Sequence, residues 1–176
     1  MHNLSCVFRV KLWHIYTVKR RKSMQTRVPH DPAYTALIGT CVYVFAYYEW
    51  AIIYLIQQFK PGFVSRYSRG APMTSGGVIA KLLAILNDSS VSYTAVSKTE
   101  IQTCHDEFAR LIKKRNALIH AHPITDHDGS QILNYQTRPD RSLPDMKWPV
   151  SEAETAIQEF DAAACSANTL LHRLLP

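Results

Sequence analysis

The chain has 176 residues, of which 47% are hydrophobic and 19% charged, which suits one folded domain and is too little for two well-packed ones. Six Gly and nine Pro exclude a collagen-like or low-complexity chain. The four Cys lie far apart in sequence, which excludes a dense disulfide framework and a CxxC zinc motif. We therefore expect a reduced, cytoplasmic protein.

The net charge of +6 comes from the N-terminal arm. Residues 1–23 contain six Lys or Arg and no acid, so the remaining 14 basic residues balance the 14 acidic ones. Such an arm can follow an RNA backbone, act as a targeting segment or form a poorly ordered extension, and Met24 offers an alternative start. We expect residues 1–30 to be a basic, disordered extension and residues 31–176 to form the folded domain.

A long first helix is predicted from Asp31-Pro32, where an Asp can cap free N–H groups and Pro suits the first helical position. Residues 33–59 are apolar on nearly all sides, and Lys60-Pro61-Gly62 ends the helix. This helix is either buried in a core or spans a bilayer. Glu49 favours the core, because a carboxylate inside a membrane is costly. We expect no membrane partner.

Two further helices are predicted after a loop at residues 61–73. Thr74 or Ser75 can cap a helix that ends near Asn87; the glycines around its start lack the Lys-Ser/Thr pair of a phosphate-binding Walker loop. Ser97 and Glu100 match a capping box, and the helix that follows ends at the His-Pro dipeptide of residues 122–123.

The rest of the chain combines a turn-rich segment with a final helix. Residues 123–150 hold four prolines and one glycine, which are typical of turns, and the segments 131–135 and 146–150 could pair as a small hairpin. Ser151 and Glu154 match a second capping box. The last helix has an apolar face at three- and four-residue spacing, made by Ile157, Phe160, Ala164, Ala167, Leu171 and Leu174. The order of elements predicts an all-α bundle.

A misplaced charge marks the third helix. Its apolar positions follow a three-four spacing through Phe108, Leu111, position 115 and Leu118, and position 115 is Arg. A buried guanidinium needs a carboxylate or an opening to solvent. Glu49 is equally isolated in the first helix, so the two charges form either an ion pair that fixes helix register or a polar site.

The segment after this charge contains further polar residues: Lys113, Lys114, Arg115, Asn116, His120 and His122. At about 100° per residue, Asn116 and His120 lie about 40° apart around the helix, whereas Arg115 and His120 lie about 140° apart. A long Arg side chain near a helix end can reach the same groove as His120.

The pattern Arg115-Asn116-x-x-x-His120 resembles the Arg-x4-6-His motif of the HEPN superfamily. Members are small four- or five-helix up-and-down bundles with this motif at the end of the third long helix. The resemblance covers residues 31–175 and includes the aromatic first helix around Glu49, the turn-rich or β-hairpin insertion after the motif, and the amphipathic last helix.

The resemblance implies a metal-independent, cofactor-free endoribonuclease, a toxin or abortive-infection defence component with a possible cognate antitoxin, whose active groove lies between two copies of the chain. Arg115, His120 and Asn116 would be catalytic, Glu49 and His122 supporting, and Lys113 and Lys114 RNA-binding. RNA cleavage needs a proton-transfer group, which an imidazole provides, and stabilisation of phosphorane charge, which a guanidinium provides. A second copy would supply the second imidazole.

Other interpretations stay open. Some relatives carry His-x-Tyr after the motif, but this chain has His120-Ala121-His122, so tyrosine modification there is not expected. His122, Asp126, His127 and Asp128 could be metal ligands, although their spacing is also typical of a polar turn. The stronger alternative is a non-catalytic module of the same superfamily that binds RNA, a nucleotide or a protein.

Overall fold

The computed structural model describes residues 28–70, 73–137 and 145–175, and divides the chain into a segment Met1–His30 and a compact unit Asp31–Pro176. The predictions for the basic arm fall mainly on residues 1–27, outside the described residues. All that follows concerns the compact unit.

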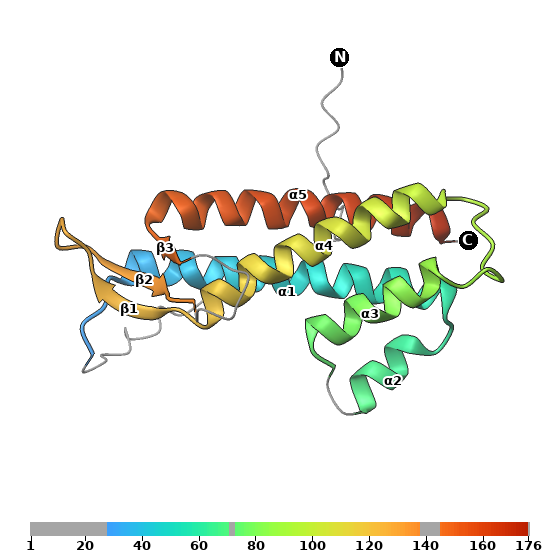
Figure 1. Ribbon diagram of the computed structural model, residues 1–176, viewed down its shortest axis with the longest axis horizontal. Helices are drawn as coiled ribbons and strands as arrows, with labels where there is room; N and C mark the ends of the chain where they lie inside the picture. Colours follow the sequence, from blue (N-terminus) through green and yellow to red (C-terminus); the bar gives the residue numbers. More distant parts are fainter. Residues whose placement is uncertain (1–27, 71–72, 138–144, 176) are drawn as a thin grey trace, which may run out of the picture. The chain divides into compact units, whose positions relative to one another are not determined.

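Helices dominate the compact unit, with a small sheet before the last one (Figure 1). The coarse prediction of a helical bundle is confirmed, and the described residues form five helices and three strands. In chain order these elements are α1 (Pro32–Phe59), α2 (Phe63–Arg69), α3 (Ser75–Leu86), α4 (Lys98–Ile119), β1 (His122–Thr125), β2 (Gln131–Tyr135), β3 (Met146–Trp148) and α5 (Val150–Leu174).

Three helices begin at the capping residues that the sequence predicts. Asp31 accepts from the N–H groups of residues 33 and 34, Thr74 accepts from Gly77, and Ser97 and Glu100 form a complete capping box. The second predicted capping box is wrong. Pro149 precedes α5, which begins at Val150 without a side-chain cap, so Ser151 already lies in the first turn. The strand β3 leads directly into this helix and sets its start.

The short helix α2 replaces the loop predicted for residues 61–73. Gly62 takes a left-handed conformation with φ 81°, which reverses the chain after α1. Gln57 then accepts a 2.9 Å hydrogen bond from the Val64 N–H, and Phe63 is buried. Tertiary contacts therefore hold a short helix whose two Ser residues and flanking Gly62 and Gly70 locally favour a loop.

The core lies between α1, α4 and α5. α5 runs beside α1 and makes the most extensive helix contact of the unit, through a face rich in small buried residues such as Ala153, Ala156 and Ala164 (Figure 1). α4 crosses this pair, and the centroid of its Phe108 ring lies 6.1 Å from that of Phe45 and 5.2 Å from that of Tyr48. α3 packs on α4 and α1.

The sheet has the order β1-β2-β3, and both pairs are antiparallel. Leu133 opposite Trp148 confirms the predicted hairpin between the second and third strands, whereas the first strand was missed because it follows α4 without a loop. The Tyr34 hydroxyl donates to the Trp148 carbonyl at 2.6 Å and accepts from the Leu133 N–H at 3.0 Å. These bonds attach the sheet to α1.

Candidate functional site

Arg115 lies in the C-terminal half of α4 and points toward α1 and α3. It is half-buried, its guanidinium donates to the Ser75 hydroxyl, and it lies 4.9 Å from the centroid of the Phe45 ring. Ser75 is only 4% exposed and occupies the first turn of α3. In the described part of the chain no carboxylate forms a salt bridge with Arg115. The charge is therefore held by a hydroxyl and an aromatic face, and it is not neutralised.

Glu49 follows Phe45 by one helical turn but does not pair with Arg115. Its Oε1 atom is buried and has no hydrogen-bond partner among the described residues. Tyr67 of α2 lies close enough to both charges for them to affect its pKa. Burial raises the pKa of the phenol, the Glu49 carboxylate raises it further, and the Arg115 guanidinium lowers it. Of the two alternatives, the register-fixing ion pair does not form among the described residues, and the two charges lie apart around Tyr67.

The start of α3 adds to the positive potential around Arg115. Thr74 caps the helix, and the Met73 side chain occupies the space that a Cβ at Gly77 would take, so a larger residue there would displace Met73. The N-terminus of a helix carries a partial positive charge. A guanidinium at that end makes the place suited to an anion such as a phosphate.

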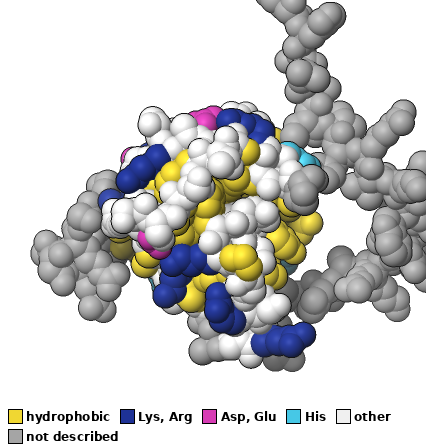
Figure 2. Space-filling model, turned by 90° about the vertical axis from the view of Figure 1, so that its right-hand side faces the viewer, with side chains coloured by type: hydrophobic (Ala, Val, Ile, Leu, Met, Phe, Trp, Pro, Cys, Tyr) yellow, Lys and Arg dark blue, Asp and Glu magenta, His cyan; other side chains and the backbone are white. Residues whose placement is uncertain are grey.

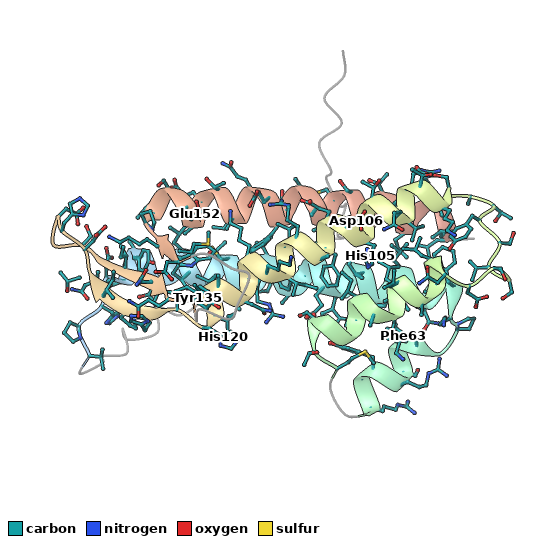
Figure 3. The ribbon with its side chains drawn as sticks, viewed as in Figure 1. Phe63, His105, Asp106, His120, Tyr135 and Glu152 are labelled. Atoms are coloured by element: carbon teal, nitrogen blue, oxygen red, sulfur yellow. The ribbon has the colours of Figure 1, made fainter. Side chains whose placement is uncertain are left out.

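His120 lies at the end of α4, where it is the C-cap residue. It is exposed and extends from the lower edge of α4 in the view of Figure 3, whereas Asn116 is half-buried one turn earlier. Five residues of helix separate Arg115 and His120 by about 7.5 Å along the axis. The Arg115 guanidinium contacts Ser75 of α3 and Phe45 of α1, and within the described residues of one chain it makes no contact with this imidazole.

His122 lies just beyond His120, in β1. It pairs with Asn134 across the sheet and is exposed. Since successive strand residues point to opposite faces, its orientation is set by the sheet and not by α4. His122 and His120 are therefore two exposed imidazoles at one end of the bundle, carried by different elements.

The two lysines before Arg115 differ in exposure and in salt bridges. Lys113 is exposed and forms no salt bridge in the described structure. Lys114 is 14% exposed and its Nζ lies 2.7 Å from Glu152 and 2.6 Å from Glu159, both on α5. The RNA-binding role predicted for both lysines therefore fits Lys113, whereas Lys114 joins α4 to α5.

The metal-ligand alternative finds no geometric support. In residues 28–70, 73–137 and 145–175, no group of three or more His, Cys, Asp or Glu side chains could hold a metal ion. Asp126 is hydrogen-bonded to Lys147, which holds the pKa of its carboxyl far below the usual range, with smaller contributions from His127. These residues form a polar turn around Gly129, whose φ is 85°.

Two hollows lie away from Arg115. One, of about 650 Å³, lies between α4 and α5 over Tyr48, Cys104 and Leu170, and the other, of about 500 Å³, lies beside the sheet and the start of α5. Neither is lined by Arg115 or His120. Burial raises the pKa of the Cys104 thiol to about 12, so this cysteine is not a nucleophile at neutral pH.

Sequence reasoning missed Ser75, Phe45 and Tyr67 as neighbours of the candidate site. Each belongs to a different helix from Arg115, and nothing in its local sequence marks it. In the sequence, the position of Arg115 among apolar residues was what indicated a site. Its partners could not be predicted, because they depend on the rotation of α1, α2 and α3 relative to α4.

Comparisons with known proteins returned no match: no family model matches the chain, and neither the curated proteins nor the solved structures gave a match.

Proposed function

We propose that the chain is a metal-independent endoribonuclease of the HEPN type that cleaves RNA by attack of the 2′-hydroxyl, and that it serves as a toxin or defence component. The observation that supports this most is Arg115: a half-buried cation that is held in place by Ser75 and Phe45 and has no salt-bridge partner in the described structure. A positive charge kept free of carboxylates, at a helix N-terminus, suits a phosphodiester.

The chemistry needs few groups. A general base removes the 2′-hydroxyl proton, the oxygen attacks phosphorus, and a five-coordinate phosphorane forms. The P–O5′ bond then breaks, the leaving oxygen takes a proton, and a 2′,3′-cyclic phosphate remains. Arg115 would stabilise the phosphorane charge, His120 would transfer the protons, and Asn116 would orient the phosphate.

The separation of Arg115 and His120 argues for a site shared by two copies. In one chain the guanidinium faces α1 and α3 while the imidazole is exposed at the end of α4. A two-fold dimer supplies two of each group, so that an acid and a base can act on opposite sides of one phosphate. Glu49 and His122 would support this site, and Lys113 would contact the RNA backbone.

A second candidate is a non-catalytic module that binds RNA or a nucleotide through Arg115. The exposed position of His120, apart from the guanidinium, favours it, because phosphate binding needs no proton transfer. Exposed basic residues on α2, Arg66 and Arg69, would extend such a surface.

The test is cleavage of single-stranded RNA by the purified chain in EDTA. We expect cleavage that survives chelation, leaves 2′,3′-cyclic phosphate ends and is lost in Arg115→Ala and His120→Ala, whereas His127→Ala, which changes a histidine of 88% side-chain exposure in the polar turn, keeps it. Equal rates in all variants refute the proposal. RNA binding without cleavage supports the second candidate, and loss of cleavage in EDTA supports metal catalysis.

A further inference from the structure

A hollow of about 650 Å³ lies between the N-terminal half of α4 and the C-terminal half of α5. Its walls follow one face of each helix, because the lining residues recur at three- and four-residue spacing. α5 contributes short side chains, among them Ala162, Ala163 and Ser166, and α4 contributes Thr103 and Cys104. Because these side chains are short, they leave space between the two helices, and its volume is typical of sites for small molecules.

Tyr48 of α1 forms the floor of this hollow and is only 1% exposed. The centroid of its ring lies 6.2 Å from that of Phe45 and 5.2 Å from that of Phe108, so the ring is fixed in the core. Its hydroxyl forms no hydrogen bond with any described residue. The polar side-chain atoms that are fully enclosed without a partner, in the same part of the chain, belong to Glu49 and Trp148. The Tyr48 hydroxyl is not one of them, so it borders the hollow that its residue lines.

The Tyr48 hydroxyl keeps its proton at neutral pH, because burial raises the pKa of the phenol further above neutrality. It can therefore donate one hydrogen bond into the hollow. The hydroxyls of the walls already donate to carbonyl groups one turn earlier in their own helices, namely those of Thr103, Ser166 and Thr169. The rest of the wall surface is mainly apolar. Among the described residues, a molecule in the hollow would thus meet one unpaired hydroxyl surrounded mostly by carbon atoms.

Ion pairs between α4 and α5 lie at both ends of the hollow. Arg110 contacts Glu107 and Glu159 at one end, and Arg173 contacts Glu100 at the other. Figure 2 faces the end of the unit at which α4 begins and α5 ends, and it shows acidic and basic side chains side by side above hydrophobic ones. Glu100 and Glu107 are about 10 Å apart along the helix axis. A polypeptide would have to break one of these pairs to lie in the hollow, whereas a short molecule fits between them.

We propose that this hollow binds an uncharged, mainly apolar small molecule with one hydrogen-bond-accepting oxygen, of the class of medium-chain esters and ketones. The oxygen would accept from the Tyr48 hydroxyl, and the hydrocarbon part would lie against the short side chains of α5. The unpaired donor selects an oxygen-bearing molecule over a pure hydrocarbon, because a buried donor without a partner costs free energy. The paired charges at the two ends disfavour an ionic molecule, which would lose its hydration without gaining a free counter-charge.

The first experiment titrates the full chain with methyl octanoate and follows the amide signals by NMR. We expect a Kd of about 0.1 mM and shifts centred on the residues that line the hollow. Octanoate, which carries a charge in place of the ester, should bind at least about 10-fold more weakly. This site goes beyond RNA cleavage and does not depend on it, because neither Arg115 nor His120 lines the hollow.

Tyr48→Phe tests the donor, because it removes the hydroxyl and keeps the ring that packs in the core. We expect the Kd of methyl octanoate to rise about 10-fold, the effect of one hydrogen bond. The Kd of propylbenzene, an apolar probe without an accepting oxygen, should not change. Equal losses for the two probes, or no loss for the ester, would show that the hydroxyl does not select the ligand.

Ser166→Leu tests the location, because it fills the hollow from an exposed position of α5. It should abolish binding of both probes, whereas Thr155→Leu should keep both Kd values: Thr155 is exposed on the same helix, its hydroxyl also bonds within that helix, and it does not line the hollow. Circular dichroism checks folding, and Ala162→Leu replaces a Ser166→Leu chain that does not fold.

Four results would each overturn the proposal. They are no binding of methyl octanoate to the full chain, equal binding of octanoate, an unchanged Kd in Ser166→Leu, and a ligand-free dimer that Ser166→Leu converts to a monomer. The last result, measured by sedimentation velocity, would assign the hollow to a second copy of the chain. RNA cleavage is scored separately in EDTA, so failure of this proposal and failure of the proposed function are distinguishable.

Discussion

The charged residues on two sides of α4 differ in whether they are paired with carboxylates or with basic groups. The side facing α5 is a ladder of ion pairs: Lys114 contacts Glu152 and Glu159, Arg110 contacts Glu159 at 3.1 Å, and Glu100 binds Arg173. The side facing α1 and α3 carries Arg115, which contacts the Ser75 hydroxyl and the Phe45 ring. Neighbouring cations in one helix thus differ in environment: Lys114 pairs with carboxylates and joins two helices, whereas Arg115 has no carboxylate partner in the described structure, which is why we propose it as the phosphate-binding group.

Replacing Arg115 should have the largest effect and should separate activity from stability. We expect Arg115→Ala to lower the rate of RNA cleavage about 1,000-fold, because the phosphorane charge loses its stabilising group. The loss of stability should be about 1 kcal/mol, from one hydrogen bond and one cation–π contact. Single-turnover cleavage and thermal unfolding measure the two effects.

Arg115→Lys is the matched control, because it keeps the charge and loses the planar pair of donors. We expect an intermediate rate. If Arg115→Ala cleaved RNA at the normal rate but had a much lower melting temperature, Arg115 would be a stabilising residue, like Lys114 and Arg110 on the side of α4 that faces α5.

Replacing His120 tests the proposed proton-transfer group, which lies exposed at the C-terminal end of α4. His120→Gln should reduce cleavage about 100-fold and leave RNA binding unchanged, since general acid–base catalysis contributes at least that much. His120 is exposed, so the melting temperature should stay the same. Cleavage and filter-binding measurements on the same preparation check this, and reduced binding with unchanged cleavage of bound RNA would contradict it.

The sequence predicts much of the fold because helix starts are local. Asp31, Thr74 and Ser97 cap helices as their side chains dictate, and the three-four spacing in α4 identifies the buried residues Phe108, Leu111 and Leu118. Errors occur where tertiary contacts decide. The segment of α2 folds because Gln57 and a buried Phe63 hold it, and β1 forms because β2 lies beside it.

In the candidate site, too, local sequence identifies one feature and tertiary packing decides the rest. That Arg115 is out of place follows from helical spacing alone. Glu49 was one of two alternatives for its surroundings, as an ion-pair partner, but Ser75 and Phe45 hold it, because the rotation of α3 and α1 about their own axes depends on packing over the whole unit. Spacing can therefore identify an unusual residue without identifying its neighbours.

On the other side of α4, Lys114→Met should affect stability alone. Removal of the ammonium leaves Glu152 and Glu159, which are 31% and 29% exposed, without this partner. We expect a loss of about 1–2 kcal/mol, less than for a fully buried pair because water reaches these carboxylates. The melting temperature should fall by about 4 °C, with cleavage per folded molecule unchanged.

Lys113→Met removes the same charge at an exposed position without a salt bridge, so it should leave the melting temperature unchanged and weaken RNA binding modestly. If both lysine variants lost equal stability, the ion pairs of Lys114 would not be the reason.

The smallest effect should come from replacing Arg173, which pairs with Glu100 at the N-terminal end of α4, and it should be a change in how stability depends on pH. Hydrogen bonds from Arg173, and then from Ser97, lower the pKa of the Glu100 carboxyl from 4.5 to about 2. A lowered pKa in the folded state stabilises the protein above pH 4.5, and this contribution is lost as pH falls from there toward about 2. Arg173→Met should therefore make the melting temperature fall less steeply in this window, whereas Lys113→Met should keep the original slope. Parallel slopes for the two variants would mean that Glu100 gains nothing from Arg173, and that only Lys114 and Arg110 join α4 to α5 through charge.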